Sequence, residues 1–149
     1  MKQKISLILE TKTIEKSSNG KIFGNIYLSN EHIYFPEKDW NDFIVIILSW
    51  WVTSLIKLQS NQSIEEVFNF MDGSFAFSIK MKGSKLCYIT CYDTATEEII
   101  EIIENYSFKD INKNIFEVAC TLEEYCIKNN WINEDIKELK NSISKYKSI

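Results

Sequence analysis

Hydrophobic and polar residues alternate in part along residues 4–14, through Ile5, Leu7 and Leu9, which is typical of a strand. Residues 21–29 are then expected to form the strand that returns beside residues 4–14. Asn19-Gly20 between them favours a hairpin, because both residues accept positive φ. Ile33–Phe35 is a further short extended segment that ends at Pro36. We therefore expect an N-terminal β-hairpin followed by a short strand.

The longest hydrophobic run, Phe43–Ile56, predicts a buried helix. We expect this helix to begin at a cap on Asp39 or Asn41, to end near residue 59, and to form the centre of the core. Spanning a membrane takes about 20 apolar residues, so the run is too short for that role. Apolar residues cover most of its circumference, as in a helix enclosed on most sides. Its polar positions form one narrow stripe, which consists of Asp42, Ser49, Thr53 and Lys57.

Three strands are expected next, arranged as an antiparallel meander. Val67–Met71 ends at the turn signal Asp72-Gly73. Phe75–Met81 alternates apolar and polar residues most cleanly and predicts a half-buried strand. Gly83-Ser84 then turns the chain into Leu86–Tyr92.

Residues 97–104 fit two structures. At 100° per residue, the glutamates of this segment fall on one side of a helix and the isoleucines on the other, and Thr94–Glu97 fits a capping box. The isoleucines are β-branched and also suit a strand. Because neither face of a strand would be purely apolar, we favour the helix.

The rest of the chain predicts two amphipathic helices. Ser107–Asp110 fits a second capping box, and Asn133 caps the last helix. Apolar residues recur behind these caps at helical spacing: Phe108, Ile111, Ile115, Val118, Leu122 and Tyr125 in the first helix, and Ile136, Leu139, Ile143 and Tyr146 in the second. We expect an α+β fold with an antiparallel sheet (hairpin plus meander) around the buried central helix and a helical C-terminal third.

Length and charge limit the class of protein. The chain has 149 residues, a common size for one domain, so residues 1–149 are expected to form a single domain. Its formal net charge is −4, and all 17 basic residues are lysines. Arginine is the preferred bidentate ligand of phosphate and guanine, so an acidic chain without arginine is a poor nucleic-acid binder. Neither nucleic acid nor a membrane is an expected partner.

The N-terminal sequence and the cysteines indicate a cytoplasmic protein. Ile5–Leu9 is too short for the apolar core of a signal peptide and runs into Glu10. The four cysteines are then expected to be reduced thiols. Cys87 and Cys91 share one face of a predicted strand, but neither a C-x-x-C motif nor a nearby histidine completes a metal site. We expect no metal and no cofactor.

Candidate catalytic residues are few. His32 is the only histidine, and its place beside Ile33–Phe35 favours a structural role. Asp72 is the best-placed carboxylate, but an aspartate in a tight turn is usually structural. Trp50-Trp51 offers a ligand platform or, as we favour, a core pair with one indole near the surface. No catalytic residue is predicted.

The acidic residues are concentrated in one segment of the chain. Residues 93–124 hold nine acidic residues and two lysines, a net charge of −7. Such a segment is either a solvated face or a docking surface for a basic partner, because complementary charge speeds association and selects partners. If the segment is a docking surface, we predict that its partner-binding residues are Asp93, Glu97, Glu98, Glu101, Glu104, Glu123 and Glu124.

Three segments carry a resemblance to a known class of protein: Tyr34–Phe43 with Trp50-Trp51, Phe68–Phe75, and Cys126–Trp131. They resemble small cytoplasmic immunity proteins of bacterial polymorphic-toxin and contact-dependent growth inhibition systems. The resemblance spans roughly residues 34–131 and is carried by aromatic, structural positions. It implies a non-enzymatic inhibitor that binds a cognate toxin domain, often a nuclease, and blocks its active site or substrate groove. It assigns no contact residue.

The leading hypothesis is therefore an immunity protein that binds a toxin domain through an acidic surface. A nuclease has a basic groove for phosphate, which an arginine-free acidic surface complements in charge. Two alternatives stay open. One is a small enzyme that uses carboxylates or the Cys87/Cys91 pair, and the other is a scaffold or dimerisation module built on the C-terminal helices.

Overall fold

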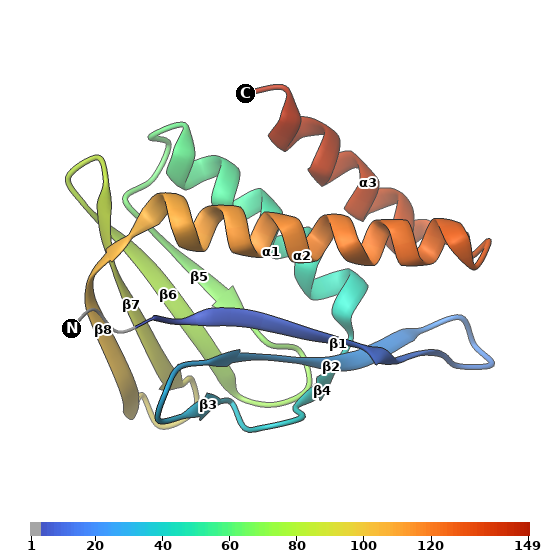
Figure 1. The fold of residues 1–149 in the computed structure, drawn as a ribbon, viewed down its shortest axis with the longest axis horizontal. Coiled ribbons are helices and arrows are strands. Elements are labelled where there is room, and N and C mark those ends of the chain that lie inside the picture. Colours follow the sequence, from blue (N-terminus) through green and yellow to red (C-terminus); the bar gives the residue numbers. More distant parts are fainter. Residues whose placement is uncertain (1–3) are drawn as a thin grey trace.

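The chain adopts an α+β fold in which three helices pack with two four-stranded antiparallel sheets (Figure 1). The structure is a computed structural model that describes residues 4–149. The α+β fold class agrees with the expectation from the sequence. The elements are β1 (Ser6–Lys16), β2 (Ile22–Ser29), β3 (Tyr34–Phe35), β4 (Asn41–Asp42), α1 (Ile44–Gln59), β5 (Glu65–Asn69), β6 (Phe75–Lys82), β7 (Leu86–Asp93), β8 (Ile99–Ser107), α2 (Phe108–Lys128) and α3 (Glu134–Lys147).

The two sheets contain the predicted hairpin and the predicted meander. In the first sheet β1 and β2 pair across the Asn19-Gly20 turn, and both β3 and β4 add to β2. In the second sheet β5, β6, β7 and β8 lie in chain order. The sheets leave β1 and β8 as edge strands, and both edges lie near the start of α2.

Helix α1 lies at the centre of the molecule, but it begins later than predicted. Asn41 and Asp42 form β4 and pair with β2, so neither Asp39 nor Asn41 caps the helix. The residue at the cap position is Phe43, which makes no side-chain hydrogen bond there. The Asp42 carboxylate binds other backbone groups instead. None of the helices in residues 4–149 combines the length and the apolar composition that crossing a membrane requires.

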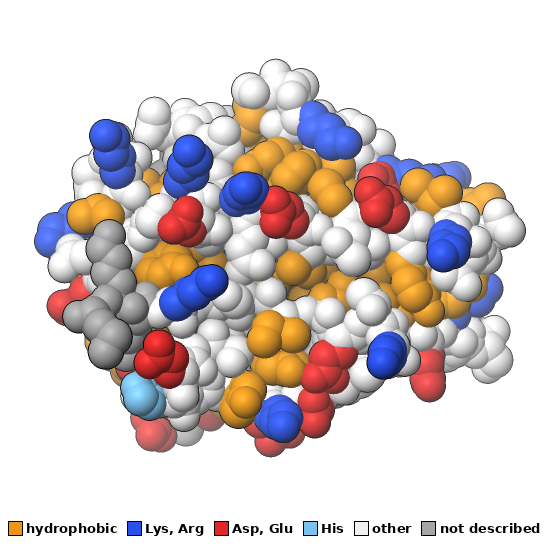
Figure 2. Space-filling model, viewed as in Figure 1, with side chains coloured by type: hydrophobic (Ala, Val, Ile, Leu, Met, Phe, Trp, Pro, Cys, Tyr) orange, Lys and Arg blue, Asp and Glu red, His pale blue; other side chains and the backbone are white. Residues whose placement is uncertain are grey.

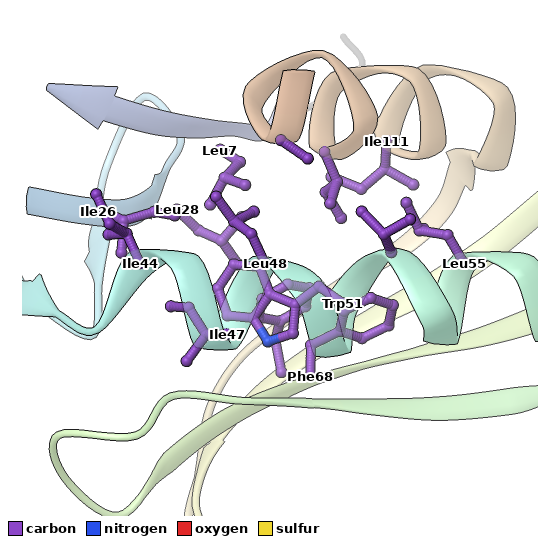
Figure 3. Close-up of a cluster of buried hydrophobic side chains, with 14 of the residues drawn as sticks. Leu7, Ile26, Leu28, Ile44, Ile47, Leu48, Trp51, Leu55, Phe68 and Ile111 are labelled. Atoms are coloured by element: carbon purple, nitrogen blue, oxygen red, sulfur yellow. The ribbon is translucent and has the colours of Figure 1, made fainter. Parts of the chain in front are cut away.

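The core surrounds α1 on several sides (Figure 3). Ile44 and Leu48 point toward Ile26 and Leu28 of the first sheet, while Trp51 points toward the second sheet. The Trp51 indole is fully buried and meets three phenylalanine rings edge-on, those of Phe68, Phe70 and Phe77. One core therefore joins both sheets to the central helix, and Ile111 and Leu139 bring α2 and α3 into it.

The helix predicted for residues 97–104 is wrong, because this segment forms most of β8. Thr94–Glu97 is a turn between β7 and β8 rather than a capping box. Strand β8 pairs with β7, and the register shifts at two points along it. The β-branched isoleucines suit this strand. Pairing with β7 supplies backbone hydrogen bonds that an isolated helix would have made internally.

The predicted caps of the last two helices are confirmed. The Ser107 hydroxyl accepts a hydrogen bond from the Asp110 N–H (3.2 Å), and the Asn133 side chain accepts one from the Ile136 N–H (2.8 Å). The predicted apolar faces point inward, although Val118, Tyr125 and Tyr146 are only half-buried. Both helices thus begin at the predicted cap residues and turn their predicted apolar faces toward the core.

Candidate interaction surface on the β7–β8 hairpin

The hairpin of β7 and β8, Leu86–Ser107, carries most of the residues predicted to bind a partner. Its turn is built by Asp93, whose carboxylate accepts hydrogen bonds from the Ala95 N–H (2.8 Å) and the Thr96 N–H (3.3 Å). Glu97 completes the turn with a positive φ of 64°. The Asp93 carboxylate therefore shapes the turn, and among the residues predicted to bind a partner it is the least available for that contact.

The glutamates of the hairpin differ in their exposure. Glu97, Glu98 and Glu104 are exposed and free to meet a partner. Glu101 is half-buried, lies opposite the buried Cys91 in the register, and accepts a hydrogen bond from the Ile102 N–H at 3.1 Å. The single helical face expected for these residues does not form, because successive residues of a strand point to opposite sides.

The structure does not bring all seven predicted residues together. Glu123 and Glu124 lie on α2, about 22 Å along the helix axis from Phe108. Strand β8 and α2 run in different directions from their junction at Ser107, so Glu97 and Glu98 lie at the opposite end of β8 (Figure 1). The predicted acidic face is therefore divided into a hairpin part and a helical part.

These two parts differ in their charge environment. Residues 108–149 contain seven lysines and seven acidic residues, and Figure 2 shows the two kinds of side chain mixed over one face of the molecule. Residues 86–107 contain five acidic residues and no lysine. In the hairpin, unlike in residues 108–149, the sequence supplies no lysine to balance the negative charge.

Exposed isoleucines accompany this charge. Ile99, Ile100 and Ile102 are 57%, 45% and 43% exposed, although a helix would have turned them toward the core. Ile102 lies opposite Thr90 in the register, and the same cross-strand row continues through Ser78 to the exposed Val67 of β5. Neighbouring apolar and acidic side chains are thus presented together, an arrangement that suits contact with another protein.

The other candidate residues take structural positions. His32 is exposed in a turn, where its backbone N–H donates to the Asn30 side chain (2.8 Å). Asp72 has an exposed side chain in the β5–β6 turn. Trp51 is in the core and Trp50 is 45% exposed, as predicted for this pair. The carboxylate that sequence reasoning missed is Asp42, which is completely buried.

The cysteines lie in apolar surroundings. Cys87 and Cys91 share the inner face of β7, as their spacing predicts, and both are fully buried. Burial raises the pKa of each thiol to about 12 and that of Cys126 to about 11. Within residues 4–149, no three His, Cys, Asp or Glu side chains are grouped as a metal site would require.

These pKa values predict slow thiol chemistry. At pH 8 almost no Cys87 or Cys91 thiolate is present in the folded protein, because each pKa is raised far above that pH. We expect iodoacetamide to alkylate both about 1000-fold more slowly than in urea, as read by peptide mass spectrometry. Half-buried Cys120 provides the internal comparison and should react first. Rapid native alkylation of Cys87 or Cys91 would instead support the thiol-enzyme alternative.

Comparison of the chain with protein-family models, with curated proteins and with solved structures found no match.

Proposed function

We propose that this chain is an immunity protein that binds a cognate bacterial toxin domain and neutralises it by contact, rather than an enzyme. The observation that carries this proposal is the lysine-free hairpin Leu86–Ser107, which holds five acidic residues and three exposed isoleucines. The resemblance of residues 34–131 to immunity proteins of toxin systems supports the same function.

The chemistry of this surface fits a basic protein. Interfaces commonly place apolar side chains at the centre, where they become fully desolvated, and charged side chains at the rim. The exposed isoleucines supply apolar area, and Glu97, Glu98 and Glu104 supply charge of one sign beside it. A nuclease toxin, whose substrate groove carries positive charge for phosphate, is the partner class that this surface complements best.

The proposal is tested by reversing charge on the hairpin. In the double variant Glu98→Lys/Glu104→Lys both substituted side chains are exposed, so the fold should be retained. We expect association with the toxin domain encoded immediately upstream to slow by about 10-fold or more, with a weaker dependence on salt. Stopped-flow fluorescence at several salt concentrations measures both effects.

A matched control uses the helical part of the predicted acidic face. Glu123→Lys/Glu124→Lys makes the same change in net charge on α2, where lysines already balance the acidic residues. We expect this variant to associate at close to the parent rate. Equal rates for the hairpin variant, the control and the parent would remove the hairpin from the interface. If the parent chain binds no upstream toxin domain, the proposed function is wrong.

A further inference from the structure

The edges of the two sheets are not equally protected. An uncovered edge strand offers N–H and C=O groups to any extended chain that comes near. The β5 edge is covered by α1, because the Trp51 indole N–H donates to the Asn69 carbonyl at 2.9 Å. The β1 edge is covered by α2, where the Asn114 amide accepts from the Leu7 N–H (2.7 Å) and donates to the Leu7 carbonyl (3.3 Å).

Among residues 4–149, no side chain covers the middle of the β8 edge in this way. The Asp93 N–H donates to the Glu98 carbonyl at 2.9 Å, so Asp93 faces β8. Backbone groups alternate in direction along a strand, and Thr90 therefore faces β6. Ile102, which lies opposite Thr90, then points its N–H away from β7. Within the described part of the chain, that N–H donates only to the side chain of its own neighbour, Glu101, at 3.1 Å.

A groove of about 1100 Å³ runs along this edge. Ile102–Ser107 of β8 forms one side, Lys4–Ser6 lies across from it, and Asp110 and Asn114 of α2 also line it. Six residues of β8 border the groove, and the first two of them, Ile102 and Ile103, precede the register shift opposite Cys87 and Ile89. Ile5 and Ile103, both nearly fully buried, give the groove an apolar component.

We infer that an extended, basic segment of the partner protein binds in this groove and adds as a strand to the free edge of β8. The inference rests on the function proposed above and specifies how the toxin domain is held. Main-chain hydrogen bonds supply affinity in such strand addition, and side-chain pockets supply specificity. Here the Ile102 N–H meets a carbonyl of the added segment in place of the Glu101 carboxylate.

The charge of the groove determines which occupant fits. Glu104 and Asp110 line it against a single lysine, Lys4, and the Glu101 carboxylate lies at the same edge. Lysine or arginine side chains on the added segment would pair with these carboxylates. A second copy of this chain is the wrong occupant, because two hairpins together bring ten acidic residues and no lysine.

The irregular register of β8 limits the pairing to a short stretch. Register shifts flank the segment Glu101–Ile103, one between Cys91 and Tyr92 and the other between Cys87 and Ile89 of the partner strand β7. Bulges of this kind twist an edge strand and reduce indiscriminate pairing. Strand addition here requires a segment that also fits the groove, which favours one partner over unspecific aggregation.

Ile102→Pro tests this binding mode directly. Proline has no N–H, and its ring obstructs an incoming strand, but the Ile102 N–H makes no bond to β7, so pairing within the sheet is kept. We expect the dissociation constant for the upstream toxin domain to rise at least tenfold, measured by isothermal titration calorimetry. The control Ile102→Val keeps the N–H and the branched side chain, and its dissociation constant should stay within about twofold of the parent value.

The outcomes separate the binding mode from the function. If Ile102→Pro keeps its thermal transition and binds as tightly as the parent, strand addition is wrong while the proposed function stands. If the parent itself fails to bind, the proposed function and this inference both fail. Should the proline variant unfold, hydrogen exchange of the Ile102 amide in the parent complex decides: protection supports strand addition, and unchanged exchange refutes it.

Discussion

Replacing Trp51 with alanine is expected to lower the free energy of unfolding by about 4 kcal/mol, because large-to-small changes at a buried tryptophan lose packing and leave a cavity. The Trp51 ring centroid lies 5.1 Å from that of Phe70, 5.2 Å from that of Phe77 and 6.3 Å from that of Phe68. The indole N–H also donates to the Asn69 carbonyl. The substitution therefore empties the junction between α1 and the β5–β6–β7–β8 sheet.

The adjacent residue provides a matched control for this prediction. Trp50 has the same side chain on the same helix but is 45% exposed. Trp50→Ala should cost less than about 1 kcal/mol, since exposed sites lose little packing. Trp51→Phe keeps most of the ring and should cost about 2 kcal/mol through the lost volume and hydrogen bond. Urea unfolding measures all three, and equal losses at Trp50 and Trp51 would contradict the buried position of Trp51.

The position of this helix shows what the sequence pattern predicts well. An apolar surface interrupted only by a narrow polar stripe requires enclosure, and α1 is enclosed. Asn19-Gly20, Gly83-Ser84 and the caps at Ser107 and Asn133 are local signals, and each specifies a turn or a helix start without help from the rest of the fold. The hairpin, the β6–β7 turn and the last two helices follow these signals, whereas the capping box at Thr94–Glu97 and the cap expected at Asp39 or Asn41 do not form.

Residues 97–104 were not predictable in this way, and β8 shows the physical reason. Its two register shifts disturb the alternation of inward and outward residues that identifies a strand. The glutamates and isoleucines then mimic the period of a helix. Only pairing with β7, a contact made in the folded chain, decides between the two structures.

The candidate surface was predictable in charge but not in shape. The sequence identifies residues 93–124 as acidic, yet the direction of α2 after Ser107 separates Glu123 and Glu124 from the hairpin. Strand β8 lies at an edge because of the strand order, which the sequence pattern did not predict. Likewise, the sequence drew attention to Asp72, while the buried aspartate is Asp42. Residue type is local information, whereas burial is set by contacts between distant segments.

Asp42→Ala is the second substitution with a large expected effect. The Asp42 carboxylate accepts hydrogen bonds from the Phe43 N–H (2.7 Å), the Trp40 indole N–H (3.0 Å) and the Met71 N–H (3.1 Å). It also accepts one from the Asp72 N–H at 3.2 Å. Hydrogen bonds to a charged acceptor are strong, and their loss leaves part-buried donors unsatisfied. We expect the free energy of unfolding to fall by about 3 kcal/mol.

Two further variants distinguish the contribution of the Asp42 carboxylate from that of the neighbouring turn. Asp42→Asn presents one amide N–H₂ group to donors that bind both carboxylate oxygens, so about half of the loss should remain. Asp72→Ala removes an exposed carboxylate from the same turn but keeps the backbone N–H that binds Asp42, and should cost less than about 0.5 kcal/mol. If Asp42→Ala unfolds at the same urea concentration as Asp72→Ala, the buried carboxylate does not stabilise the contact between β4 and the β5–β6 turn. A loss confined to Asp42 shows that this one acceptor holds together segments 29 residues apart in the chain.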